Sequence, residues 1–386
     1  MNRLILIGNG FDLAHNMKTS YKDFILDYLS SSFEKANRMG QYKDDLMLVT
    51  KNSYFRNHLT NLKNSFNEWD IKEFSRHIGG DFSMSISAGN SVYRDKKPEY
   101  EYSVLCYSNF LQKLIKQYKE YNWVDVENEY YQLLCDLSTK KDGLKEIEQL
   151  NKEFQNIRDL LHNYLDKVEQ DYVNENSLYF RKDILTKQLT DNLYNDNSKP
   201  ENILFLNFNY TITIKYYFTE IQKIIPNSSI INIHGELKNK DNPIIFGYGD
   251  EDDETNFNLI EKYDECLKYV KTYWYLRTNN YQQLMDFVSS NDYEVYIMGH
   301  SCGLSDKTLL SEIFNNENCR KIKALTYQKR NNEDLNINST DYIDKTYQIG
   351  RIFKNKGDMR KKLVPFNSND ILKIMYDRNA KLLSSI

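Results

Sequence analysis

An uninterrupted apolar stretch near the start of the chain, Leu4 to Ile7, runs directly into Gly8-Asn9-Gly10. Such a run is typical of a strand that is buried on both faces of a parallel sheet. Two glycines after a strand let the backbone approach a pyrophosphate, while the N–H groups of a following helix face the anion. A tight turn without a ligand explains Gly-x-Gly about as often. Asp12 is then expected either at the mouth of a ligand cleft or as a helix cap.

Short apolar runs return after Pro200 and alternate with helical segments. They lie at residues 203–207, 230–233, 244–246, 294–298 and 321–326. This alternation predicts an α/β fold, a Rossmann-like doubly wound parallel sheet that the first strand joins. Thr19 or Ser20 is expected to cap the first long helix.

Between about residues 40 and 200 the apolar pattern is helical. From Leu144 to Val168 apolar residues recur three or four positions apart, which predicts one long amphipathic helix. We therefore expect a discontinuous nucleotide-binding domain (1–36 and 200–335), a large inserted helical domain (37–199) and a C-terminal extension (336–386). The long helix is expected to pack within the chain, with a homo-oligomer formed through the helical domain as the alternative.

The composition excludes several classes of protein. The 386 residues are 40% hydrophobic and 27% charged, which is typical of a globular protein. A net charge of −4 gives no strong nucleic-acid signal. The five cysteines are scattered without a C-x-x-C pair, which fits reduced thiols and excludes a zinc ribbon. No apolar stretch suits a signal peptide or a membrane span, so we expect a cytoplasmic protein without membrane contact or bound metal.

Polar residues follow two of the predicted strands. Asn207 and Asn209 come after the run 203–207, and His234 comes after the run 230–233. Open α/β sheets bind ligands at the carboxyl ends of their strands, and a histidine there is well placed to titrate near neutral pH. Each residue also has a structural explanation, because asparagines form turns and many histidines lie in cores.

A third polar segment, Gly299 to Gly303, matches the G-x-S-x-G nucleophile elbow of α/β-hydrolases. Those enzymes place the acid and the histidine after the serine, whereas all six histidines of this chain precede Ser301. The segment therefore predicts a ribose or phosphate contact instead, with Ser305 and Asp306 at the start of the next helix.

Two acidic residues behind Trp123, Asp125 and Glu127, allow two interpretations. On a helix they diverge and mark an N-terminus favoured by the helix dipole. On a strand or in a loop, both could reach the nucleotide cleft.

Together these segments resemble the AbiH family of bacteriophage abortive-infection proteins. The similar segments are Gly8 to Ala14, Thr19 to Tyr21, Trp123 to Glu127, Phe208 to Thr211, Ile233 to Gly235, Phe246-Gly247, Thr278 to Tyr281 and Gly299 to Ser301.

A more distant resemblance is to sirtuin-like NAD-hydrolysing domains. It implies a sirtuin-like form of the α/β fold, with Asn209 and His234 as the catalytic residues. Thr211 stands where those domains have an aspartate, and the absent zinc ribbon argues against protein deacylation. The residues expected to contact the nucleotide are Gly8, Asn9, Gly10, Phe11, Asp12, Tyr210, Gly235, Gly299, Ser301 and Asp306.

The two resemblances imply an anti-phage effector that hydrolyses NAD to nicotinamide and ADP-ribose, with a phage-derived trigger of unknown identity. One alternative is a sensor module that binds NAD or ADP-ribose without hydrolysis. Another is a nuclease-type toxic effector, against which the acidic balance and the lack of a metal cluster count.

Overall fold

The computed structural model describes residues 1–52, 71, 74, 75, 82–84, 101–118, 122–141, 143–176, 182–190, 199–249, 254–328 and 336–372. Contacts divide the chain into two compact units. The first unit comprises Met1–Thr19, Leu165–Phe257 and Tyr269–Ile386, and the second comprises Ser20–Tyr164 and Asn258–Lys268. The three-part division expected from the sequence stays a prediction.

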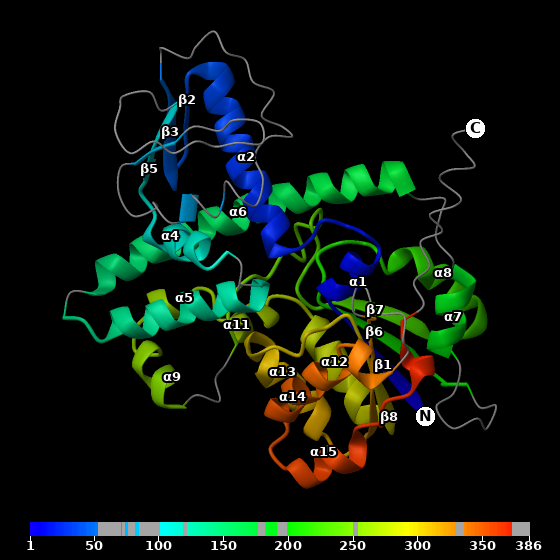
Figure 1. Cartoon of the computed structure of the whole chain (residues 1–386). Helices are drawn as coiled ribbons and strands as arrows, with labels where there is room; N and C mark the ends of the chain where they lie inside the picture. Colours follow the sequence, from blue (N-terminus) through cyan, green and yellow to red (C-terminus); the bar gives the residue numbers. More distant parts are fainter. Residues whose placement is uncertain are drawn as a thin grey trace, which may run out of the picture. The chain divides into compact units, whose positions relative to one another are not determined.

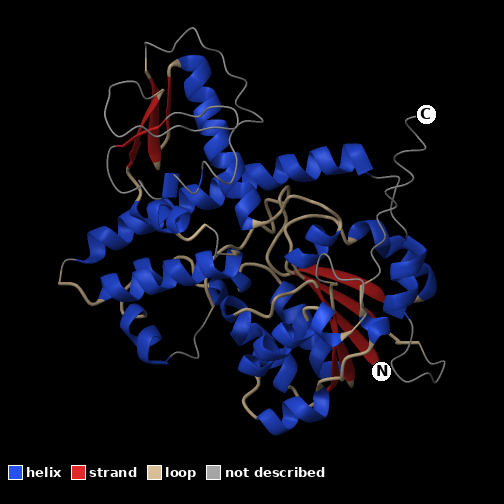
Figure 2. Cartoon of the chain, viewed as in Figure 1, coloured by secondary structure: helices blue, strands red, loops and turns tan. Residues whose placement is uncertain are grey.

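The first unit contains a five-stranded parallel sheet (Figures 1 and 2). Its strands run in the order β7-β6-β1-β8-β9, and every neighbouring pair is parallel. The prediction of an α/β fold with a parallel sheet is confirmed. The strand bounds are β1 (Asn2–Ile7), β6 (Ile203–Asn207), β7 (Ser228–Asn232), β8 (Tyr293–Met298) and β9 (Cys319–Leu325).

Apolar side chains bury both faces of this sheet. On one face Ile5 and Ile7 pack with Phe205 of β6, with Leu189 of α7 and with Tyr217 of α8. Alternate residues of β1 point to the opposite face and are equally buried, which explains the uninterrupted apolar run. The helices of this unit are α1 (Asn9–Ala14), α7 (Lys182–Thr190), α8 (Lys215–Ile224), α11 (Lys271–Tyr275), α12 (Asn280–Ser290), α13 (Lys307–Asn315), α14 (Tyr342–Ile352) and α15 (Lys356–Lys362).

The prediction of a strand at residues 244–246 is wrong. The segment has no regular secondary structure, because the backbone groups of Ile245 form hydrogen bonds with residues of loops and not with a neighbouring strand. The N–H of Ile245 donates to the carbonyl of His234, and its carbonyl accepts from the hydroxyl of Tyr210.

The second unit combines helices with a four-stranded sheet of order β2-β3-β5-β4, whose pairs are antiparallel. The sequence pattern did not predict these strands. Ser20 caps α2 through a capping box with Asp23, as expected. The elements are α2 (Tyr21–Met39), β2 (Gln41–Lys43), β3 (Met47–Lys51), β4 (Phe82–Met84), β5 (Tyr102–Cys106), α4 (Asn109–Lys116), α5 (Trp123–Ser138) and α10 (Asp264–Leu267).

Two helices contribute residues to both units, α6 (Gly143–Asn176) and α9 (Glu254–Ile260). The prediction of a long helix over residues 144–168 is confirmed by α6. The acidic run 250–254 lies mostly outside the described residues.

Trp123 begins α5, so the helical interpretation of its acidic neighbours is the right one. A carboxylate oxygen of Asp125 accepts a hydrogen bond from the N–H of Asn122 at 2.8 Å, while Glu127 is buried. The five cysteines are free and buried. No described helix has both the length and the apolar character needed to cross a membrane.

Candidate functional site

The carboxyl ends of the parallel strands meet at one edge of the sheet in the first unit. Gly8 follows β1, Asn209 lies two residues beyond β6, His234 lies two residues beyond β7, and Gly299 follows β8. Because β7, β6, β1 and β8 are successive neighbours, segments far apart in the sequence come together here. Open α/β sheets bind their ligands at this edge.

The two glycine segments of this edge pack backbone against backbone. The N–H of Gly10 donates to the carbonyl of Gly299 at 2.9 Å. A Cβ atom on Gly8 would lie 2.4 Å from the Cα of His300. A Cβ atom on Gly299, whose φ is +76°, would lie 2.2 Å from the N atom of Phe11. The glycines therefore allow a close approach between the loops behind β1 and β8.

Backbone N–H groups of the loop behind β1 donate hydrogen bonds to carbonyl groups of the protein itself. The N–H of Gly8 donates to the carbonyl of Met298, and the N–H of Phe11 donates to the carbonyl of Gly8. Asn9 is held by Thr19, whose hydroxyl donates to the Asn9 side chain at 2.6 Å. The role of this loop in binding a diphosphate stays a prediction.

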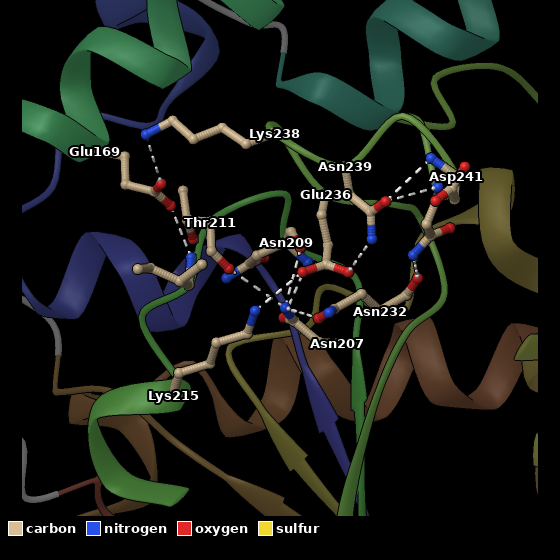
Figure 3. Close-up of polar contacts among 12 residues, drawn as sticks. Glu169, Asn207, Asn209, Thr211, Lys215, Asn232, Glu236, Lys238, Asn239 and Asp241 are labelled. Atoms are coloured by element: carbon tan, nitrogen blue, oxygen red, sulfur yellow. Dashed lines mark hydrogen bonds and ion pairs between the residues drawn. The ribbon is translucent and has the colours of Figure 1, made fainter.

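Asn207, the last residue of β6, organises the loop that carries Asn209 (Figure 3). Its Nδ2 donates to the carbonyl of Asn209 at 3.1 Å and to Oδ1 of Asn232 at 2.9 Å. Its Oδ1 accepts from the N–H of Asn209 at 3.1 Å. The loop is joined to the neighbouring one because Asn209 Nδ2 donates to the carbonyl of Gly8 at 3.1 Å.

A buried cluster of charged and polar side chains lies beside these loops, centred on Asp306. His234 Nε2 lies 3.3 Å from Asp306 Oδ1 and 3.1 Å from the hydroxyl oxygen of Tyr275. Lys271 Nζ lies 2.8 Å from the same Oδ1, and His300 Nε2 lies 3.4 Å from Oδ2. The three side chains that contact Asp306 all come from segments outside its own helix.

The cluster holds Asp306 as a carboxylate. Burial alone would raise its pKa, but the charge of Lys271 and the contacts with His234 and His300 hold it well below its usual range. Burial lowers the pKa of His234, so that its imidazole is neutral near pH 7. The N–H of Cys302 donates to Nδ1 of His300 at 3.0 Å, so Nε2 carries the proton that faces Asp306.

Aromatic rings pack around the two histidines. The ring of Phe208 meets His234 edge to face at 5.0 Å between centroids, and His300 at 4.1 Å. The ring of Tyr275 also stacks with His234, with an interplanar angle of 12°. An apolar surround weakens solvent screening and strengthens the contact between His234 and Asp306.

Comparison with models of protein families shows to which family the chain belongs. The model of the family described as "Bacteriophage abortive infection AbiH" matches residues 4–328. The chain belongs to the AbiH family. Membership indicates a role in the abortive-infection defence of bacteria against phage, and the matched range contains the entire site. No curated protein matches the chain.

The AbiH-family chain brings some of its predicted site residues into contact and leaves others apart. His234 and Asp306 are in contact, and Asn209 contacts Gly8. Ser301 is exposed at the end of β8 and takes part in none of these contacts between described residues. Gly235 serves a turn, because its φ is +85° and a Cβ atom would lie 2.2 Å from the carbonyl oxygen of Pro243.

The sequence of this AbiH-family chain did not point to Lys271, to Tyr275 or to the role of His300. His300 lay within a segment already recognised as similar to the family. Lys271 and Tyr275 lie on α11, which follows no strand of the sheet, so no pattern in the sequence pointed to them. Among the described residues no group of three or more histidine, cysteine or acidic side chains is arranged to hold a metal ion.

Proposed function

We propose that this AbiH-family chain is an abortive-infection effector that hydrolyses NAD to nicotinamide and ADP-ribose at the His234–Asp306 pair. The observation that carries the proposal is the 3.3 Å contact between a neutral, buried imidazole and a carboxylate at the ligand-binding edge of a parallel sheet.

The strand order supports a nucleotide as the ligand. Numbered along the chain, the five strands of the parallel sheet follow the order 3-2-1-4-5, which matches the first five strands in the 3-2-1-4-5-6 order of dinucleotide-binding sheets. In such sheets the ligand lies where the strand order reverses, here between β1 and β8. Gly8 and His300 follow these two strands, and His300 contacts Asp306.

The chemistry assigned to the pair is activation of water. The carboxylate of Asp306, 3.3 Å from Nε2 of His234, favours the tautomer that keeps its proton on Nε2 and has an unshared electron pair on Nδ1. Nδ1 then takes a proton from water while the water oxygen bonds to C1′ of the ribose. The bond between C1′ and the pyridine nitrogen breaks, and its electron pair leaves with neutral nicotinamide. The proton on His234 is released to solvent, which completes the hydrolysis.

Asn209 is proposed to position the water or the leaving amide, as a positioning residue held through Asn207 and Gly8. The loop from Gly8 to Asp12 is proposed to face the diphosphate. For that, the amides of Gly8 and Gly10 would have to exchange their present partners.

The test is to mix the purified full chain with NAD and to measure nicotinamide and ADP-ribose. The wild-type protein is expected to release both in equal amounts. His234→Ala is expected to lower the rate about 10²- to 10⁴-fold, the range for loss of a general base. Asn209→Ala is expected to lower it as well. His162→Ala, on α6 and outside the site, is the matched control and is expected to keep the wild-type rate. A wild-type rate in His234→Ala would overturn the assignment.

Binding of NAD or ADP-ribose without hydrolysis is the second candidate. The near-complete burial of His234, His300 and Asp306, each at most 6% exposed, favours it because a water nucleophile needs access. A melting temperature that rises with NAD, without release of nicotinamide, would establish this function instead.

A further inference from the structure

A cavity of about 150 Å³ lies in the first unit beside the carboxylate of Asp306. One wall is aromatic, since the rings of Tyr275 and Tyr281 stack with centroids 5.9 Å apart and an interplanar angle of 15°. Leu276 and Leu309 add apolar surface. The cavity therefore has the flat, apolar walls that suit a planar ring.

The size of the cavity selects a small ligand. A protein cavity of about 150 Å³ lined by apolar side chains accommodates benzene. Complete drug-sized ligands occupy about 300–1,000 Å³. A single six-membered ring thus fits this volume, whereas a bicyclic purine or a whole nucleotide exceeds it.

Ser305 supplies an unused hydrogen-bonding group in the wall. The residue is 1% exposed, and its Oγ makes no hydrogen bond to any residue that the structure describes. A buried hydroxyl without a partner is costly, so a ligand that bonds to it gains affinity. Asp306 and Lys271 line the same cavity, and Asp306 lies 3.3 Å from His234.

We propose that this cavity binds one planar aromatic ring bearing a carboxamide, with the ring against the stacked pair of Tyr275 and Tyr281 and the amide bonded to Ser305. This inference deepens the proposed function and rests on it for the identity of the ring, which would be the leaving nicotinamide. The cavity then places the leaving group directly beside the residues that activate water.

The test compares three probes, nicotinamide, pyridine and adenine, by calorimetric titration of the full chain and of Ser305→Ala. Nicotinamide is expected to bind the wild-type protein and to lose about five-fold or more in affinity in Ser305→Ala, the effect of one hydrogen bond. Pyridine lacks the amide, so its weaker binding should be equal in both proteins. Adenine should not bind in this cavity.

Two controls keep the result interpretable. Ser305→Ala removes a hydroxyl without a partner among the described residues and should keep the wild-type melting temperature. Ser311→Ala, on the adjacent helix α13 and outside the cavity, should keep the wild-type affinity for nicotinamide.

The outcomes separate this inference from the proposed function. Release of nicotinamide from NAD without binding of free nicotinamide at millimolar concentration would overturn the inference alone. Binding that depends on Ser305 without release from NAD would overturn the hydrolase and leave the cavity assigned. If Ser305→Ala lowered the affinities for nicotinamide and pyridine equally, the assignment of the amide to Ser305 would be overturned. If adenine bound as tightly as nicotinamide, the assignment of the ring size would be overturned.

Discussion

The hydroxyl of Thr211 donates a 2.6 Å hydrogen bond to Oδ2 of Asp12, across 199 positions of sequence. Both side chains are buried at the edge where the loops behind β1 and β6 meet. Burial raises the pKa of Asp12 to about 6, because the loss of water outweighs the hydrogen bonds with Thr211, Thr213 and Asn209, which lower it. His15, one turn of chain further on, is buried as well, and burial lowers its pKa to about 4. Two groups with opposite shifts thus lie close together in sequence.

Asp12→Asn is expected to remove a pH-dependent loss of folding stability. The folded protein holds the Asp12 proton up to about pH 6, whereas the unfolded chain loses it near its ordinary pKa of about 3.8. Asp12 therefore destabilises the fold increasingly as the pH rises between these values, by about 3 kcal/mol in total. The free energy of unfolding can be measured with urea at pH 4 and pH 8. The stability of the variant relative to the wild type should be higher at pH 8 than at pH 4 by about that amount. An unchanged difference would mean that Asp12 is not buried as a neutral acid.

His15→Gln is expected to show the opposite dependence. The N–H at Nδ1 donates to the carbonyl of Phe11, and Nε2 contacts the hydroxyl of Tyr217, so the folded state favours the neutral ring. At His15 the unfolded chain takes up a proton below about pH 6.5 and the folded chain only below about pH 4, so His15 destabilises the fold increasingly as the pH falls through this range, by about 3 kcal/mol. Urea unfolding at pH 4.5 and pH 7.5 should therefore show that the stability of the variant relative to the wild type is about 3 kcal/mol higher at pH 4.5 than at pH 7.5. Because the pKa shifts of Asp12 and His15 oppose each other, the changes in stability that they cause with pH largely cancel in the wild type. The stability of each single variant should therefore change more steeply with pH than that of the wild type.

Gly8→Ala is expected to destabilise the protein by about 3 kcal/mol or more, as overpacking of a rigid backbone does. The added methyl group would lie 2.4 Å from the Cα of His300, where only the backbone could move. Gly350→Ala is the matched control, because its methyl group would meet only the flexible side chain of Met359, at 3.5 Å. Within helix α14 this control should gain about 0.5–1 kcal/mol. Equal melting temperatures for the two variants would contradict the close approach of the loops.

Glu294→Ala is expected to cost about 3–5 kcal/mol, the penalty for leaving a buried charge without its partner. Arg3 lies opposite Glu294 in the pairing of β1 with β8, and its Nε donates to Glu294 Oε1 at 2.7 Å. The guanidinium also lies over the ring of Tyr296, 4.2 Å from the centroid. The double variant Arg3→Met, Glu294→Leu should recover most of the stability, since apolar replacement of a buried pair is often neutral. Denaturant unfolding measures both, and a cost below about 1 kcal/mol for Glu294→Ala would show the pair to be solvated.

Local pattern was enough to predict several elements. The uninterrupted run before Gly8 predicted β1, because a strand covered on both faces needs apolar residues at every position. Thr19 or Ser20 was the predicted cap of α2, and the structure shows that Ser20 caps it through a side chain that bonds to the nearby N–H of Asp23. The three-to-four spacing along residues 144–168 predicted α6. These signals act within a few residues and do not depend on distant contacts.

The candidate site could be predicted only in part, because its contacts join residues that are far apart in the sequence. Asn209 and His234 were visible because they follow strands, and parallel strands end at the same edge. His300 and Asp306 lay in a recognised segment, but the contact of His234 and His300 with the carboxylate of Asp306 required the order of the strands. The packing role of Gly8 became visible only in the structure, which shows that the backbone of His300 fills the space beside it.

The sequence by itself determined the strands of the parallel sheet, the first helix cap, the long helix and the relationship to the AbiH family. Only the tertiary structure decided that residues 244–246 form a loop and that Lys271 and Tyr275 join His234 around Asp306. Periodicity and capping are encoded in neighbouring residues, whereas the burial and the pKa of a side chain depend on segments that the chain brings together from far apart. For Asp306 those segments supply the cation, both histidines and the aromatic ring that contacts one of them.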